Sequence, residues 1–280
     1  MNTLMKKKNE SSEQLNIQLF LLCMLAALLC RRLGKISSLR IICGMLRTMI
    51  YVGVYIGWGI SIYKRVIQKS VRNVLIFIAE LIIFWFVVRT TKYFFTMDNQ
   101  IARYLWYSYY IPMLFIPVAV LQAAFFLGKS EEYRLPKWLK GVYIPTAVLV
   151  LLVLSNDLHQ LVFSFPVGSA WSDSHYTYGW GYYVVLVWEV VCALTAFVLM
   201  IYKCRHSQKK KYLPLFGIGA AVLYAVLFIS GVAWVQEIGG DITAVLCLFF
   251  VGILESCVRC GLIQTNTGYD QLFEVCTLGA

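Results

Sequence analysis

Long apolar runs separated by short polar segments divide the sequence and leave little room for a soluble core. A transmembrane helix needs about 20 predominantly apolar residues, and most of these runs approach that length. Hydrophobic residues make up 60% of the chain and charged residues 14%, whereas soluble proteins carry about 25% charged residues. The pattern therefore predicts an all-α integral membrane protein. Eight runs are expected to span the bilayer: Leu15–Cys30, Ile41–Tyr63, Val74–Val88, Leu105–Leu127, Gly141–Gln160, Tyr182–Tyr202, Leu213–Val235 and Ile242–Val258.

The basic residues indicate how these helices are oriented, because Lys and Arg accumulate in the cytoplasmic loops of membrane proteins. Seventeen of the 25 fall near the two ends of the chain and in the loops Lys64–Arg72, Lys129–Lys140 and Lys203–Lys211. Seven fall on the opposite side, and Arg47 lies within a span. Both ends are therefore predicted to be cytoplasmic. The segment Arg31–Arg40 is the exception, since it is basic yet must face outward if the first run spans.

A polar group at the outer end of the fifth predicted helix is the candidate ligand site. If that helix continued, positions 156, 159, 160 and 163 would share one face, because they are three, four and seven residues apart. A polar face beside hydrocarbon is costly unless it meets protein, water or a ligand. The next predicted helix should pack antiparallel to this one, and its acidic residue Glu189 lies near the same outer side. We predict a ligand site open to the outer side and formed by Asn156, Asp157, His159, Gln160 and Glu189.

The same residues permit a purely structural interpretation. The polar side chains can close the end of the helix at the lipid–water boundary. Glu189 and Arg47 enter the bilayer from the same side at similar depths, so a pair between them would relieve both charges. Glu80 falls near the bilayer centre. An acid at that depth is expensive, and the sequence does not separate a structural role from a functional one.

Motifs of enzymes and metal proteins are missing from the sequence. It contains no Walker loop, HExxH, GxSxG or glycine-rich nucleotide lid. Most of the nine cysteines lie in apolar runs, where cysteine behaves as a small hydrophobe. Cys257 and Cys260 form a lone CxxC, which without a second pair is weak evidence for zinc or redox chemistry. We expect no catalytic residue, no metal site and no cofactor. Nucleic acid is not an expected partner either, because the basic residues lie in short loops between apolar runs.

Four segments, in this order, resemble the N-terminal seven-transmembrane sensor region of bacterial sensor histidine kinases, in the version found in Firmicutes. They read LWYSYYIPMLFIPVAV, GKSEEYRLPKWLKGVYIP, LSNDLHQLVFSFP and LESCVRCGLIQTNTGYDQLF. The resemblance extends from about Arg40 to the last residue. It implies a seven-helix transmembrane bundle over residues 41–258, preceded by one extra, signal-anchor-like helix over 15–30. Residues 1–14 would then be a cytoplasmic N-terminus and 259–280 a cytoplasmic tail that begins an output region.

The resemblance also implies a function and a location. The chain would be a multi-pass protein of the bacterial cell membrane and the sensory module of a two-component histidine kinase. It would pass an extracytoplasmic or intramembrane stimulus to a cytoplasmic kinase output, and would act as a homodimer. The kinase's ATP-binding region is not among these 280 residues, so the chain by itself is not expected to phosphorylate a protein. A small-solute transporter or a stand-alone membrane receptor is the alternative. A transporter would be expected to carry inverted repeats, and none is evident.

Overall fold

A computed structural model describes residues 2–95, 99–130, 132–166, 175–205, 212–239 and 242–266. Helices dominate this part of the chain, and one hairpin of two very short strands is the exception. The elements are α1 (Asn2–Leu33), α2 (Arg40–Arg65), α3 (Lys69–Thr90), α4 (Asn99–Ser108), α5 (Tyr110–Phe126), α6 (Lys137–Gly141), α7 (Tyr143–Leu154), α8 (Asn156–His159), β1 (Phe163–Ser164), β2 (Thr177–Tyr178), α9 (Trp180–Arg205), α10 (Tyr212–Ile229), α11 (Ala233–Gly239) and α12 (Ile242–Arg259), with a 3-10 turn at Ser37–Leu39 and a π-helical turn at Thr91–Phe95.

Six of the described helical stretches are long and apolar enough to cross a membrane. They are Arg40–Arg65, Lys69–Phe94, Gln100–Phe126, Lys137–Leu154, Trp180–Cys204 and Tyr212–Ile229. Each coincides with a run predicted from the sequence, so the predicted all-α, multi-pass membrane protein is confirmed. The remaining two runs correspond to α1 and α12, which are helical. That these two helices also cross the bilayer stays a prediction.

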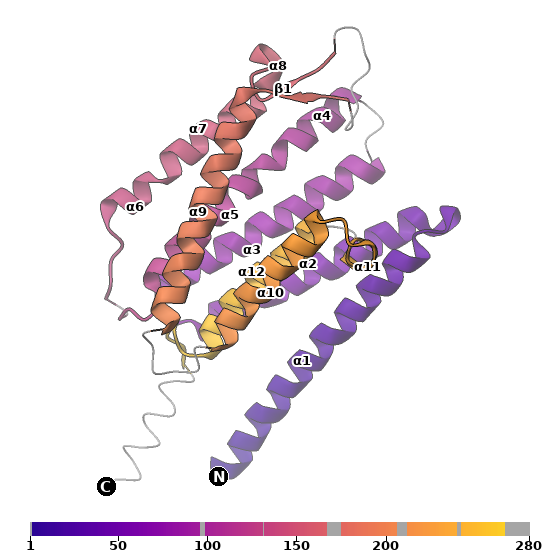
Figure 1. The fold of residues 1–280 in the computed structure, drawn as a ribbon. Coiled ribbons are helices and arrows are strands. Elements are labelled where there is room, and N and C mark those ends of the chain that lie inside the picture. The colour runs from indigo at the N-terminus through magenta and orange to yellow at the C-terminus, as the bar shows by residue number, and fades with distance from the viewer. Residues whose placement is uncertain are drawn as a thin grey trace.

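The long helices run up and down side by side, as Figure 1 shows. The start of α1 and the end of α12 lie at the lower end of the bundle, and the β1–β2 hairpin with α8 lies at the upper end. With both ends cytoplasmic, as the charge distribution predicts, the hairpin end is the outer end. We call the two ends of the bundle outer and cytoplasmic on that basis.

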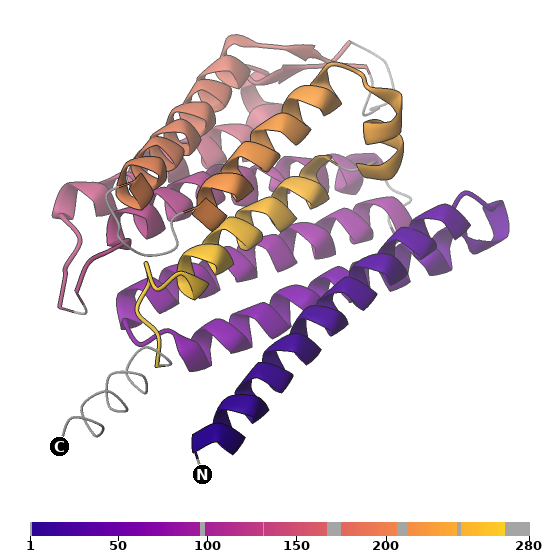
Figure 2. The ribbon, with the colours of Figure 1, turned by 60° about the horizontal axis from the view of Figure 1, so that its bottom comes forward.

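The α4–α5 stretch is the central span of the bundle. Of its apolar window 72% is buried within the protein, against 44% or less for the other five candidate spans. Helix α5 packs against α3, α7 and α9, while α2 packs against α3, and α10 against α12. Helix α1 contacts α2 and lies along the outside of the bundle, which Figure 2 shows most clearly. Interior helices of this kind are apolar on all sides, and α5 is buried on nearly every side.

Proline placement explains an interruption in the central span. The predicted single helix Leu105–Leu127 is broken at Tyr109, between α4 and α5. Pro112 lies three residues beyond this break, in the first turn of α5, where a missing backbone N–H is tolerated. Continuing the helix would leave the Ser108 carbonyl without its donor and against the proline ring. Pro112 therefore accounts for the short interruption at Tyr109, whereas Pro117 lies inside α5.

The helix predicted over Gly141–Gln160 does not continue to its predicted end. It is divided into α6, α7 and α8, and α8 ends at His159. Gln160 has a left-handed backbone, with φ 50°. Beyond it the chain turns into strand β1, so position 163 does not lie on the helix face that the spacing predicted. The prediction of a shared helical face through this position is therefore wrong.

Candidate functional site

The outer end of the bundle is closed by aromatic rings packed around Phe163, which is fully buried. Trp106 of α4 lies 4.5 Å from it between ring centroids, Tyr110 of α5 5.6 Å, and Tyr176 of the hairpin 5.4 Å. This packing ties the hairpin to the central span and to α9. We call the group the outer aromatic cluster; its members are Trp106, Tyr107, Tyr110, Phe163, Tyr176, Tyr178 and Tyr182.

Asn156 holds the turn that places Phe163 in this cluster. Its side chain is fully buried. The Oδ1 atom accepts hydrogen bonds from the backbone N–H groups of Val162 and Phe163, both at 3.0 Å. The Nδ2 group donates to the Phe163 carbonyl at 2.8 Å and to the Tyr107 hydroxyl at 3.1 Å. One amide thus satisfies the N–H groups of Val162 and Phe163 and the Phe163 carbonyl, as buried polar groups require.

Asp157 extends the same network toward the surface. The Tyr107 hydroxyl donates to its Oδ1 at 2.7 Å, and Arg103 Nη2 lies 2.8 Å from its Oδ2. Arg103 and Tyr107 are both on α4, so this pair of contacts joins α4 to α8. The ion pair is about one quarter exposed, and exposed pairs contribute little stability on their own. Its geometric role, fixing two helix ends together, is the larger one.

Among the described residues, His159 and Gln160 bond only to groups within five positions of themselves in the sequence. His159 Nδ1 accepts the Leu161 N–H at 3.0 Å, and its Nε2 lies 3.2 Å from the Ser155 hydroxyl. Gln160 Oε1 accepts the Phe165 N–H at 3.3 Å. The structure therefore brings four of the five predicted site residues together, but their polar atoms satisfy the chain itself. This geometry matches the structural alternative, in which the side chains close a helix end.

Glu189, the fifth predicted residue, lies apart from these four. It is on α9, near Tyr110 and Tyr182 of the outer aromatic cluster. Within the part of the chain that the structure describes, it makes no hydrogen bond or ion pair. The predicted pair with Arg47 is not formed, because α9 packs against α5 whereas α2 packs against α3 and α1. Glu189 is thus the carboxyl of the predicted site for which the described residues supply no partner.

A second polar network ties α2 to α12 at the cytoplasmic end. Arg65 forms two parallel bonds with Glu255, Nη1 to Oε1 at 3.0 Å and Nη2 to Oε2 at 2.8 Å. Trp58 donates to Oε2 at 3.2 Å, and Arg259 Nε to Oε1 at 2.8 Å. Bidentate pairing of this kind fixes orientation as well as distance. Glu80, the acid predicted near the bilayer centre, differs from Glu255. Its side chain is exposed, near the middle of α3.

The residues that follow α12 are held by the same end of the bundle. Val66 and Thr265 form a β-bridge, and the Ile67 N–H bonds to the Gln264 carbonyl at 3.3 Å. The Gly128 N–H, just beyond α5, bonds to the Leu262 carbonyl at 2.8 Å. Two different loops therefore position residues 262–265, directly after α12.

Sequence reasoning missed Arg103 and Tyr107, the two partners of the α8 residues. Arg103 entered only as one of the outer basic residues, and Tyr107 only as part of an apolar run. The available signal was their spacing of four, which places both on one face of a helix. Nothing in the sequence shows which helix that face meets.

Comparison with known proteins agrees with the fold. A family described as the N-terminal 7TM region of histidine kinase matches residues 18–258. The match begins within α1, earlier than the resemblance read from the sequence, and ends at the last turn of α12. No curated protein and no solved structure matches the chain. Since the match covers most of the chain, this protein belongs to the family of N-terminal seven-transmembrane regions of histidine kinases.

Proposed function

We propose that the chain senses an extracytoplasmic or intramembrane stimulus and passes it to a cytoplasmic kinase output joined after its tail. The observation that carries the proposal is the way the start of the tail is held. Loops after α2 and after α5 bond to residues 262–265, directly behind α12. A shift of either helix would therefore move the segment to which an output region is joined.

The proposed input is the predicted site at the outer end, comprising Asn156, Asp157, His159, Gln160 and Glu189. The α4–α5 span connects this end with the output. Its outer part carries Arg103 and Tyr107, which bond to Asp157, and its cytoplasmic end leads to Gly128. A ligand that competes for these bonds would free α4 from α8, and one that pairs with Glu189 would act on α9 instead. The α4–α5 span would then have two arrangements, one with α4 bonded to α8 and one with α4 released. Coupling between distant sites requires such a two-state element.

We also propose that the chain is not an enzyme and that two copies pair in the membrane. Its family is a sensor region, and the kinase chemistry belongs to the output. Glu80 supports pairing, because it is exposed near the middle of α3 with Asn73 and Phe84 on the same face. A carboxyl facing lipid at that depth is costly, whereas one facing a second copy can find a hydrogen-bond partner.

A fusion of the full chain to a histidine kinase output would test the proposal. The measurement is basal autophosphorylation in membranes, so no stimulus needs to be known. Glu255→Gln removes the charge that Arg65 pairs with, weakens the link between α2 and α12, and should change the basal level at least about fivefold. Glu132→Gln, an exposed cytoplasmic glutamate, is the matched control and should leave it unchanged. Equal output from both folded variants would contradict the proposed transmission.

The input is tested in the same fusion. His159→Ala and Glu189→Gln should each change the basal level or the response to conditioned medium, while the folded fraction stays as in the parent. Unchanged signalling with intact folding would remove the outer site from the proposal. Loss of folded protein without any change in signalling per folded molecule would assign these residues to the closure of the helix end alone.

A further inference from the structure

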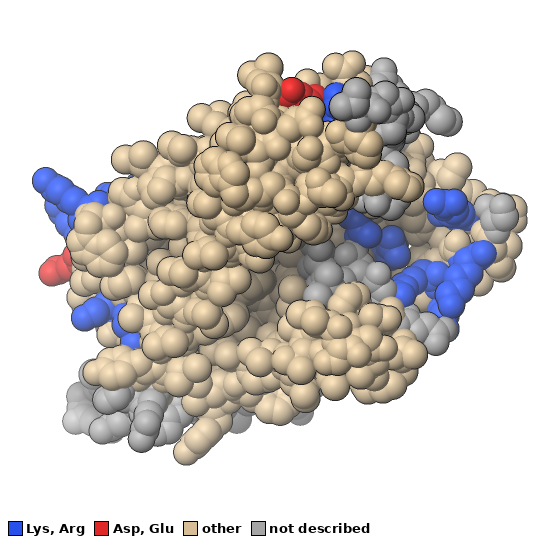
Figure 3. All heavy atoms as spheres, turned by 45° about the horizontal axis from the view of Figure 1, so that its top comes forward, with Lys and Arg blue, Asp and Glu red and all other residues tan. Residues whose placement is uncertain are grey.

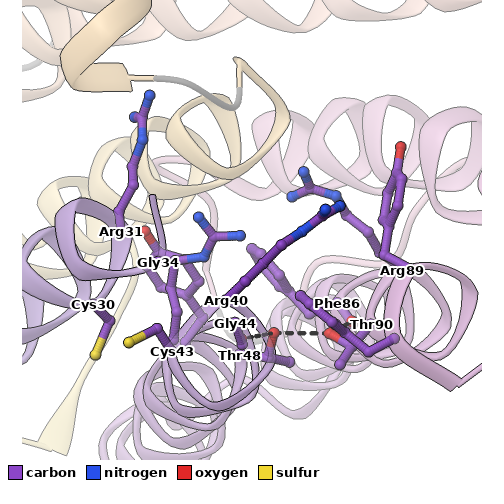
Figure 4. Close-up of a pocket in the computed structure, with 14 residues that line it drawn as sticks. Cys30, Arg31, Gly34, Arg40, Cys43, Gly44, Thr48, Phe86, Arg89 and Thr90 are labelled. Carbon is purple, nitrogen blue, oxygen red and sulfur yellow. Dashed lines mark hydrogen bonds between the residues drawn. The ribbon is translucent and has the colours of Figure 1, made fainter. Parts of the chain in front are cut away.

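Four arginines from three helices line one cavity at the outer end of the bundle. Arg31 is in the last turn of α1 and Arg89 in the last turn of α3, while Arg40 begins α2 and Arg47 lies two turns further along it. The cavity measures about 230 Å³, smaller than the roughly 300–1,000 Å³ of pockets for drug-sized ligands. Figure 4 shows Arg31, Arg40 and Arg89 around the space, together with the hydrogen-bonded pair Thr48 and Thr90.

The charged residues described around this cavity are all arginines. Among the described residues that line it there is no Asp or Glu. Arg47 repels both Arg31 and Arg89, and burial followed by the charge of Arg47 lowers the pKa of the Arg31 guanidinium. Arg40 and Arg47 make no hydrogen bond or ion pair within the described ranges. Figure 3 shows basic side chains gathered around a hollow at this end of the molecule.

This basic cluster lies at the outer end of the bundle, where the predicted orientation leaves few basic residues. Lys and Arg are disfavoured in outer loops, and the segment Arg31–Arg40 was the exception to that rule in the sequence. Bringing like charges together costs free energy unless an anion screens them. Arg40 and Arg89 are at the outer ends of their helices, which is the depth of the lipid headgroups.

An apolar groove continues from the cavity. It measures about 380 Å³ and lies between α1, α2 and the α10–α12 part of the bundle. The groove and the cavity share Arg31 and Tyr51, so the two spaces adjoin. Its other lining residues are almost all apolar: Met24, Leu28, Ala220, Leu223, Tyr224, Leu227, Trp234, Val235, Val245 and Leu248.

We propose that this composite site binds an anionic phospholipid, with its phosphate among the arginines and an acyl chain in the groove. Arginine suits this role because its planar fork donates two parallel hydrogen bonds to phosphate oxygens. The headgroup neutralises the charge, and the chain covers apolar surface that α1 leaves open. The site is separate from the α8 network and does not depend on the proposed signalling function.

The test uses the full chain in lipid nanodiscs. In phosphatidylcholine discs, adding phosphatidylglycerol should raise the thermal unfolding midpoint in a saturable way. Arg47→Gln should raise the half-saturating fraction of phosphatidylglycerol about tenfold, the effect of losing one charge-assisted bond. Arg134→Gln removes one charge from an exposed cytoplasmic loop and should behave as the parent. Arg40→Gln, at an exposed position, provides a second cavity variant in case Arg47→Gln does not fold.

Inorganic phosphate at matched ionic strength separates the two possible sources of the anion. Protection by phosphatidylglycerol well beyond that by phosphate supports the lipid. Equal protection by phosphate in pure phosphatidylcholine discs would keep the anion site but overturn the lipid assignment. A shift that is absent, or equal in Arg47→Gln, Arg40→Gln and Arg134→Gln, would overturn the proposal, because general surface charge would then explain it.

Discussion

Replacing Asn156 with alanine is the most direct test of how the outer end is built. The substitution removes the acceptor of two buried backbone N–H groups, those of Val162 and Phe163. A buried donor left without an acceptor costs about 1–3 kcal/mol, so the two together predict a loss of about 2–6 kcal/mol. The Tyr107 hydroxyl keeps its bond to Asp157 and adds little to this loss. Entry of a water molecule would move the result toward the lower limit.

The measurement is the free energy of unfolding in mixed micelles of a mild detergent and SDS, followed by far-ultraviolet circular dichroism. Ser70→Ala is the control, because Ser70 is exposed on α3 and makes no hydrogen bond within the described residues. It should change the free energy of unfolding by less than about 0.5 kcal/mol. If Asn156→Ala costs no more than this control, the amide does not hold the turn and the structural account of the outer end fails.

Three further predictions concern other parts of the molecule. In a cysteine-free background, a cysteine at Thr177 should be labelled only from outside the cell and one at Glu132 only from the cytoplasm; the reverse pattern would refute the orientation. Gly44→Ala should lower the free energy of unfolding by about 1–3 kcal/mol, because the new Cβ would overlap the Phe94 ring. Gly53→Ala, with open space on the same helix, should be neutral or slightly stabilising, and equal effects would refute the packing. The purified chain should show no saturable, magnesium-dependent binding of ATP at micromolar concentration in a filter assay, since its sequence carries no nucleotide motif.

The helices were predictable from the sequence because apolar run length alone fixes where a chain can cross a bilayer. The run Ile41–Tyr63, for example, became α2 over Arg40–Arg65, with basic residues at both ends. The interruption near Pro112 was also readable, since proline removes a specific backbone donor. These are local properties, which depend on residues close in the sequence.

The arrangement of the site was not predictable, because it depends on which helices become neighbours. Arg47 and Glu189 enter from the same side at similar depths, yet α2 and α9 pack against different helices. The prediction of one continuous helix through Gln160 was wrong for a related reason. The side chain of Asn156 offers the backbone of Val162 and Phe163 bonds that the next helical turn would otherwise have to supply.

The rings around Phe163 have a spectroscopic consequence. Trp106 lies 4.5 Å from Phe163 of β1 and 5.0 Å from Tyr176, the residue before β2, measured between ring centroids. Aromatic side chains in fixed packing give near-ultraviolet circular dichroism that vanishes when the packing loosens. The difference spectrum between the parent chain and Trp106→Phe therefore isolates the signal of this one indole. It makes Trp106 an internal optical reporter of order in the hairpin, readable in detergent or in lipid without an attached dye.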